Sequence, residues 1–205
     1  MIKTLLSDEG NAGGSDAGDQ PGYQTLDNYT FDATNDKVRD AWRMLYFTIY
    51  RANKVINRTD PATDLRKRLV AEAKVLRAYN YFELVSLWGD VPLVLDDIPP
   101  GNYTSTGRRP KADVYAQIEK DLNEAIAVLP LKGQLSAADK FRVSKGTAQA
   151  LLGKALLYQQ KWAEAATQLD LVINSGQYFL APSIGAAFSR NHEFGIESIF
   201  ETSYR

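Results

Sequence analysis

Hydrophobic and polar positions between residues 62 and 95 repeat with the period of a helix. One apolar set recurs in steps of three and four and so shares a helical face: Leu65, Leu69, Ala73, Leu76, Tyr79 and Phe82. A second set joins it toward the C-terminal end: Val70, Tyr81, Leu84, Val85 and Trp88. A helix that is apolar on two sides must be covered by two neighbours. We therefore expect a central helix that ends at Gly89, with Pro92 preventing its continuation.

An earlier segment, Val38–Ile56, shows the same helical period. Either Asn35 or Asp36 can cap this helix, since both residue types accept hydrogen bonds from the first backbone amides. Asn53 lies among the apolar positions, and we expect its amide to satisfy backbone groups at a helix end. The segment 7–24 before this helix is rich in Gly, Asp and Ser and is predicted to be a loop.

Three more helices are predicted after the central one. The first is Ala112–Leu129, with Pro110 suited to its first turn. Another runs from a Ser144 cap through Gln160, and the last is Trp162–Asn174. Residues 96–109 and 131–143 are the predicted loops between them.

The last two of these helices, within residues 144–176, have the small-residue and aromatic spacing of a tetratricopeptide repeat. Gly153 and Ala165 are small residues at the positions where two helix axes approach closely. One such pair cannot bury its faces alone and stacks on neighbouring helices. We therefore expect an all-α fold of tetratricopeptide-like helical hairpins connected by long loops.

Beyond Gly176 the helical pattern ends. The residues up to 195 read as loop, and the stretch Ser198–Tyr204 reads as the start of a β-strand. An unpaired apolar strand edge recruits partners, so this stretch predicts poor solubility or self-association.

Composition excludes several function classes. The chain has 205 residues, 24 of them basic and 25 acidic, and this balance gives no reason to expect a nucleic-acid partner. It contains no cysteine, which excludes disulfides and a catalytic thiol. No stretch approaches the ~20 apolar residues that span a bilayer. The N-terminal run MIKTLLSDEG is too short and too soon acidic for a secretory signal peptide.

We find no catalytic or metal-binding motif. The chain has one histidine, His192, and no G-x-S-x-G sequence, so a hydrolytic triad has little to be built from. Acidic residues lie mostly on helix faces, where solvation explains them. The carboxylates at positions 8, 9, 16 and 19 do not have the spacing of an EF-hand. The sequence therefore predicts a protein that is not an enzyme and has no cofactor or metal.

The aromatic content favours a ligand-binding function over an enzymatic one, because eleven Tyr and three Trp are many for a helical chain of this size. Aromatic faces stack on sugar rings while neighbouring polar groups bind hydroxyls. Four aromatic residues have core spacing and are predicted to be core: Tyr79, Phe82, Trp88 and Trp162. The candidate ligand-binding residues are those in or near loops: Tyr23, Tyr29, Tyr103 and Trp42.

Three stretches of the chain resemble a known family. The run AEAKVLRAYNYFELVSLWGDVPLV of the central helix resembles the signature of SusD/RagB nutrient-binding outer-membrane lipoproteins of bacteria. WRMLYFTIYRANKVI and RPKADVYAQIEKDLNEAIAVLP resemble two further helices of that family. The resemblance implies a non-enzymatic surface protein that binds an oligosaccharide or other nutrient. It also implies a role as lid and partner of a SusC-like TonB-dependent transporter, at the outer membrane.

Family members are more than twice as long and carry a lipid-attachment cysteine ahead of this region. The resemblance therefore implies that residues 1–205 are the N-terminal helical domain of such a protein, truncated at both ends, with a lipid anchor that is absent from this chain. The alternative is a generic tetratricopeptide-like module for protein–protein interaction. The W-G-D-V-P end of the central signature discriminates between them, since a generic repeat does not need it. An enzyme would require hydrolysis that is lost when a specific carboxylate is neutralised.

Overall fold

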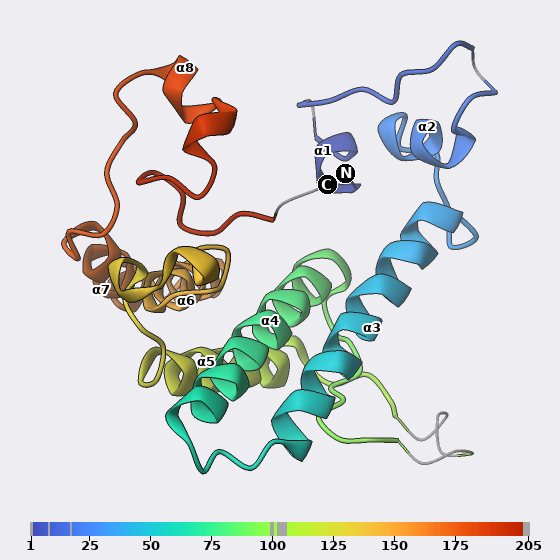
Figure 1. Cartoon of the computed structure of the whole chain (residues 1–205). Helices are drawn as coiled ribbons and strands as arrows, with labels where there is room; N and C mark the ends of the chain where they lie inside the picture. Colours follow the sequence, from blue (N-terminus) through green and yellow to red (C-terminus); the bar gives the residue numbers. More distant parts are fainter. Residues whose placement is uncertain (1, 8, 17, 99–100, 102–105, 203–205) are drawn as a thin grey trace. The chain divides into compact units, whose positions relative to one another are not determined.

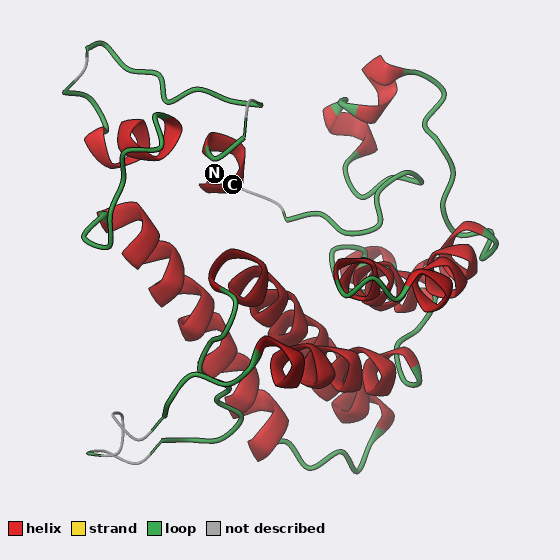
Figure 2. Ribbon diagram, turned by 180° about the vertical axis from the view of Figure 1, so that it is seen from behind, coloured by secondary structure: helices red, strands yellow, loops and turns green. Residues whose placement is uncertain are grey.

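The structure is a computed structural model that describes residues 2–7, 9–16, 18–98, 101 and 106–202. Its regular elements are helices, and an isolated β-bridge joins Val91 to Arg109 (Figures 1 and 2). The α-helices are α1 (Ile2–Leu5), α2 (Pro21–Asp27), α3 (Asp36–Arg58), α4 (Asp64–Trp88), α5 (Lys111–Ile126), α6 (Lys145–Tyr158), α7 (Trp162–Ile173) and α8 (Ile184–Ala187). The 3-10 turns are η2 (Lys132–Gln134), η3 (Ala137–Asp139) and η4 (Arg190–His192). The predicted all-α fold is confirmed.

The chain forms two compact units, Met1–Phe47 and Thr48–Arg205, with the boundary inside α3. In the first unit α1 packs against α2, burying Leu5 and Leu26. Helix α2 corrects the prediction that all of residues 7–24 are loop. Its seven residues are too few to show an apolar period, but Pro21 at its first position is a typical helix start.

Asn35, rather than Asp36, caps α3. Its Oδ1 accepts hydrogen bonds from the backbone N–H groups of Lys37, at 2.9 Å, and Val38, at 3.0 Å. Its Nδ2 donates to the carbonyl of Gly22 and to Oγ1 of Thr25, both at 2.9 Å. The buried side-chain amide of Asn35 therefore both caps α3 and connects its first turn to α2.

In the second unit α4 packs on α5, α5 on α6 and α6 on α7 (Figure 1). Thr63 caps α4 by accepting from the N–H of Arg66, and Gly89 ends it with φ of 71°, as the sequence predicted. The C-terminal half of α4 is buried on two sides, at Tyr81, Phe82, Leu84 and Val85. None of the described helices has the length and apolarity needed to cross a membrane.

Two of the aromatic residues predicted to be core are not. Tyr79 on α4 is 49% exposed and Trp162 at the start of α7 is 61% exposed, whereas Phe82 is fully buried and Trp88 is half-buried. Tyr79 lies on the α4 face toward α6, where it lines a groove instead of being covered. Helix α7 ends the series of packed helices, so its first residue lies at the edge of the unit.

The α6–α7 pair is packed closely. Ser144 caps α6, accepting from the N–H of Thr147. A Cβ at Gly153 would lie 2.7 Å from Cδ2 of Leu169, and Ala165 is 1% exposed. The small residues lie where the two helices are in contact, as the repeat pattern predicts.

The predicted strand at Ser198–Tyr204 is wrong for residues 198–202, which are irregular, while Ser203 and Tyr204 lie outside the described residues. A strand needs a neighbouring strand for its backbone groups. Here the carbonyl of Ser198 accepts from Nζ of Lys132 at 2.5 Å, and that of Ile199 accepts from Oγ1 of Thr147 at 3.0 Å. Side chains from η2 and α6 thus take the place of a strand partner.

Candidate functional site

Three of the four candidate ligand-binding residues lie in the Met1–Phe47 unit: Tyr23 in α2, Tyr29 just beyond it, and Trp42 in α3. Tyr103 lies outside the described residues. The three described side chains are taken in turn, each with its own neighbours.

Trp42 lies on an aromatic surface of α3, which comprises Trp42, Met44, Tyr46 and Phe47. The Trp42 and Tyr46 ring centroids are 4.9 Å apart with planes inclined at 48°, the contact expected for positions one helical turn apart. Met44 is 67% and Phe47 49% exposed. Asp40 and Arg43 line the same open hollow. Flat apolar rings beside hydrogen-bonding side chains are what a sugar ring requires, so this surface is chemically suited to one.

Tyr29 is 61% exposed, and its hydroxyl donates a hydrogen bond to the carbonyl of Leu6 at 2.9 Å. Its backbone is left-handed, with φ of 55°. The N–H of Thr30 bonds to the carbonyl of Thr25 and that of Tyr29 to Leu26, which is the Schellman termination of α2. Glycine is the usual residue at this position, because a Cβ is unfavourable there. An exposed aromatic residue in a conformation that favours glycine marks Tyr29 as a candidate for function.

The Tyr23 ring is half-buried, and Nζ of Lys37 lies 4.8 Å from its centroid. A cation over one face leaves less of the ring for stacking on a ligand. Tyr23 is therefore a weaker stacking candidate than Trp42 or Tyr29.

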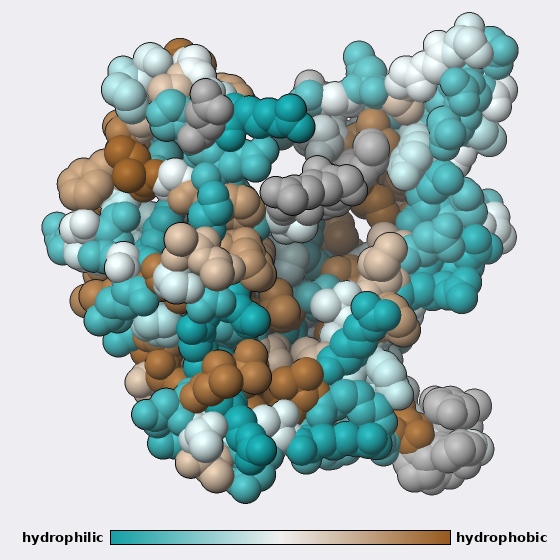
Figure 3. All heavy atoms as spheres, viewed as in Figure 1, coloured by the Kyte–Doolittle hydropathy of each residue, from teal (hydrophilic) through white to brown (hydrophobic). Residues whose placement is uncertain are grey.

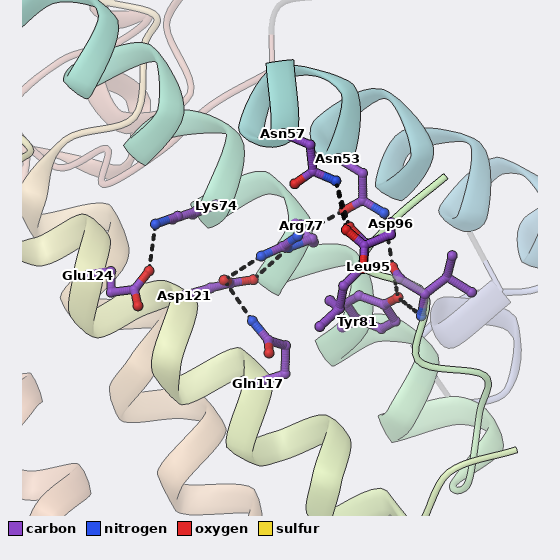
Figure 4. Close-up of polar contacts among 11 residues, drawn as sticks. Asn53, Asn57, Lys74, Arg77, Tyr81, Leu95, Asp96, Gln117, Asp121 and Glu124 are labelled. Atoms are coloured by element: carbon purple, nitrogen blue, oxygen red, sulfur yellow. Dashed lines mark hydrogen bonds and ion pairs between the residues drawn. The ribbon is translucent and has the colours of Figure 1, made fainter. Parts of the chain in front are cut away.

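A polar network in the second unit fixes the segment that follows α4, and sequence reasoning missed its charged members. The guanidinium of Arg77 donates to both carboxylate oxygens of Asp121, at 2.8 and 2.7 Å, and to Oδ1 of Asn53, at 2.9 Å (Figure 4). Arg77 and Asp121 are buried, and Gln117 also donates to Asp121. The sequence did contain a signal for this pair, because Arg77 and Asp121 each lie within the apolar stripe of their helix. A buried charge of this kind is expected to be paired.

The network continues to the backbone of Val94. Asn53 donates from Nδ2 to the Val94 carbonyl at 2.9 Å, which replaces the helix-end contact expected for this amide. The Tyr81 hydroxyl donates to the same carbonyl at 2.8 Å and accepts from the Val94 N–H at 2.7 Å. Burial raises the pKa of Tyr81 well above its ordinary value, so the hydroxyl keeps the proton that it donates.

The next residues are tied to the C-terminal end of α3. Asn57 donates to the carbonyl of Leu95 at 2.9 Å, and Lys54 and Arg58 contact the Asp97 carboxylate at 2.7 and 3.0 Å. Hydrogen bonds from Lys54 and then Arg58 hold the pKa of Asp97 below its ordinary value. These contacts fix the start of the 96–109 loop, which carries the candidate Tyr103.

Two of the described acidic residues near the N-terminus accept hydrogen bonds from nearby backbone N–H groups. Asp16 accepts from the N–H of Gly18 and Asp19 from that of Ser15, so both stabilise local turns. Within the described part of the chain no three His, Cys, Asp or Glu side chains are grouped to hold an ion. Asp8 lies outside that part.

A family model for SusD-like proteins, described as starch-binding and associating with the outer membrane, matches residues 15–157. SusD-like protein P2 of Formosa agariphila is 29% identical over 212 aligned residues, covering 100% of this chain and 40% of its own. SusD-like protein P25 of the same organism is 25% identical over 171 residues, which are 32% of its length. The chain thus spans well under half the length of these curated relatives.

Two solved structures share the fold over nearly the whole chain. A laminarin-binding SusD-like protein is 33% identical, with a TM-score of 0.86 over 97% of this chain and 48% of its own. Surface glycan-binding protein A of Bacteroides uniformis is 27% identical, with a TM-score of 0.84 over 99% of this chain and 46% of its own.

Proposed function

Because the chain belongs to the SusD-like family of starch-binding proteins that associate with the outer membrane, we propose that it is the N-terminal part of a non-enzymatic surface lipoprotein that binds a glycan. The observation that carries the proposal is the family match over residues 15–157, together with the 33% identity to a laminarin-binding relative. A polysaccharide such as laminarin or starch is the class of ligand that these relatives support.

The aromatic surface of α3 supports this function by its chemistry. Trp42 and Tyr46 offer ring faces to the apolar C–H side of a sugar, while Asp40 and Arg43 provide partners for its hydroxyls. Tyr29 offers a further exposed ring in the same unit. We assign Tyr23 a lesser role, since its ring is already in contact with Lys37, and keep Tyr103 as a candidate.

The same proposal includes the transporter. The complete lipoprotein acts at the cell surface as the lid of a SusC-like TonB-dependent transporter, anchored by lipid, and passes the bound glycan on without cleaving it. Family membership supports this role. Isolation of the complete protein from outer membranes, followed by mass spectrometry, tests it, and recovery without a TonB-dependent barrel contradicts it.

Glycan binding is tested by affinity electrophoresis in gels that contain laminarin, starch or no polysaccharide. We expect retardation of the 205-residue chain in one of the polysaccharide gels, with about a five- to thirtyfold loss of affinity in Trp42→Ala, since one stacked ring contributes on the order of 1–2 kcal/mol. Trp162→Ala is the matched control, because Trp162 is an exposed tryptophan of α7 and is not one of the residues that form the α3 surface. Equal affinities of Trp42→Ala and Trp162→Ala would remove Trp42 from the site.

A further inference from the structure

Among the described residues, the α3 surface leaves one cation without a partner. The segment Asp36–Phe47 contains three basic and two acidic side chains: Lys37, Arg39, Arg43, Asp36 and Asp40. Nζ of Lys37 lies 3.3 Å from the carboxylate of Asp36, and Arg39 donates to Oδ1 of Asp40 from Nε and Nη2, both at 3.2 Å. Arg43 is exposed and forms no hydrogen bond or ion pair with any other residue that the structure describes. Its guanidinium is therefore the excess positive charge of this segment.

Arg43 belongs to the same surface as the candidate stacking rings. It lines the hollow, of about 690 Å³, together with Trp42, Tyr46 and Phe47. Tyr46 and Phe47 follow Arg43 by three and four positions, a spacing that puts side chains on one face of a helix. Figure 3 shows strongly hydrophilic side chains over the N-terminal half of α3. Rings that can stack on a sugar and a guanidinium that can bind one of its substituents thus share one surface.

A ligand in this hollow removes water from Arg43. A charge that loses its water is unfavourable unless an opposite charge or a set of hydrogen bonds replaces that water. A neutral sugar offers only hydroxyls, whereas a carboxylate or sulfate group can accept two parallel N–H bonds from one guanidinium. Asp40, the nearest acidic residue in the sequence, already accepts from Arg39. The ligand that best satisfies Arg43 is therefore anionic.

We propose that the α3 surface prefers a glycan that carries acidic groups, and that Arg43 is the residue that binds the carboxylate or sulfate. The inference rests on the proposed function and adds the charge of the glycan to it. Trp42 and Tyr46 stack on the sugar, and Arg43 donates to an anionic oxygen attached to the same or the next sugar residue. Neutral glucans bind through the rings and hydroxyls, and more weakly.

The test compares glycans that share a backbone and differ in charge. Laminarin and starch are each prepared unmodified, oxidised at C6 to carry carboxylates, or sulfated. Isothermal titration calorimetry measures their binding to the 205-residue chain and to variants whose folding is verified by circular dichroism. Arg43→Gln removes the charge and keeps a hydrogen-bonding side chain, whereas Trp42→Ala removes the stacking ring. Arg66→Gln is the matched control, because Arg66 is an exposed arginine of α4 and is not one of the residues that form the α3 surface.

We expect an acidic form to bind at least about tenfold more tightly than the unmodified polysaccharide, because charge-assisted hydrogen bonds are stronger than those between neutral groups. Arg43→Gln should reduce this ratio of affinities to about one, and Arg66→Gln should leave it unchanged. Trp42→Ala should weaken binding of the acidic and the unmodified form by similar factors. A preference confined to the carboxylated form identifies a uronate as the bound group, and one confined to the sulfated form identifies a sulfate ester.

An acidic preference that persists in Arg43→Gln, or that is lost equally in Arg66→Gln, would overturn the proposal. So would equal affinities for the acidic and the unmodified forms, both dependent on Trp42, and that result would leave the proposed function intact. Failure to bind any of these glycans would contradict the proposed function, and this inference with it.

Discussion

At the scale of single residues, the hydroxyl of Tyr81 has an unusual position in the fold. It is the donor to one backbone group of Val94 and the acceptor from the other. Two β-strands would normally satisfy such groups for each other, but the segment after α4 is extended without a neighbouring strand at this point. One buried side chain therefore replaces a strand partner.

We predict that Tyr81→Phe destabilises the protein by about 1–3 kcal/mol, because the Val94 N–H loses its acceptor while the ring still fills its place. Urea unfolding measures the change. Tyr158→Phe is the control, since its ring packs edge-on against Phe82 and its side chain is 53% exposed. That variant should stay within about 0.5 kcal/mol of the parent. A loss for Tyr81→Phe no larger than for Tyr158→Phe would show that the hydroxyl is not needed.

Tyr29 gives a prediction that separates backbone strain from side-chain function. Its left-handed conformation favours glycine, so Tyr29→Gly should be about 1 kcal/mol more stable than Tyr29→Ala, although glycine is ordinarily the less stabilising residue. Both variants lose the ring and should bind the glycan equally weakly. Thermal unfolding and affinity electrophoresis test the two parts. Stability of the alanine variant equal to or above that of the glycine variant would contradict the assigned strain.

At the scale of elements, the contact between α6 and α7 depends on the absence of a side chain at Gly153. Alanine there gains about 1 kcal/mol of helix propensity. The added Cβ, however, would lie 2.7 Å from Cδ2 and 2.8 Å from Cγ of Leu169. Forcing helices apart in a packed interface costs about 1–3 kcal/mol, so the clash should exceed the gain.

We therefore predict that Gly153→Ala is destabilising in the parent chain and stabilising when Leu169 is already alanine. A double-mutant cycle of Gly153→Ala and Leu169→Ala, followed by chemical unfolding, measures the coupling. If Gly153→Ala has the same effect in both backgrounds, close packing against Leu169 is not the reason for glycine at this position.

The helix boundaries show which sequence signals were sufficient to predict where a helix begins or ends. The end of α4 was predictable, because a glycine with positive φ followed by Pro92 has few other interpretations. The Ser144 cap was predictable for a similar reason, since a side-chain acceptor precedes a long apolar pattern. Helix α2 was not, because its seven residues contain one buried side chain, Leu26, and a period cannot be read from one position.

At the scale of the whole molecule, the fold was largely predictable and the site was not. Helical periodicity determines which residues of α4 are apolar, but it does not specify which neighbour covers them, and so Tyr79 and Phe82 received the same prediction. The Arg77–Asp121 pair joins residues 44 positions apart, and no local pattern specifies that distance. The role of Trp42 depends on contacts with a ligand, and such contacts produce no periodic pattern in the sequence.

The two units differ in how many apolar side chains they bury, and we therefore expect them to differ in local stability. In the Met1–Phe47 unit, the buried apolar side chains between the described helices are Leu5 and Leu26. The Thr48–Arg205 unit contains the remaining buried apolar residues of the described chain and the Arg77–Asp121 pair. A small unit buries a smaller fraction of its surface and opens at lower free-energy cost.

We predict that backbone amides of α2 exchange with deuterium faster than those in the C-terminal half of α4, and that both are protected relative to an unfolded chain. Hydrogen–deuterium exchange with mass spectrometry resolves the two helices. A glycan that stacks on Trp42 and Tyr29 should slow exchange in α2 while leaving α4 unchanged, because binding stabilises the unit that holds the ligand. Equal protection of α2 and α4 without ligand would show that the molecule opens as one cooperative unit. Slowing confined to α4 would place the ligand on the Thr48–Arg205 unit instead.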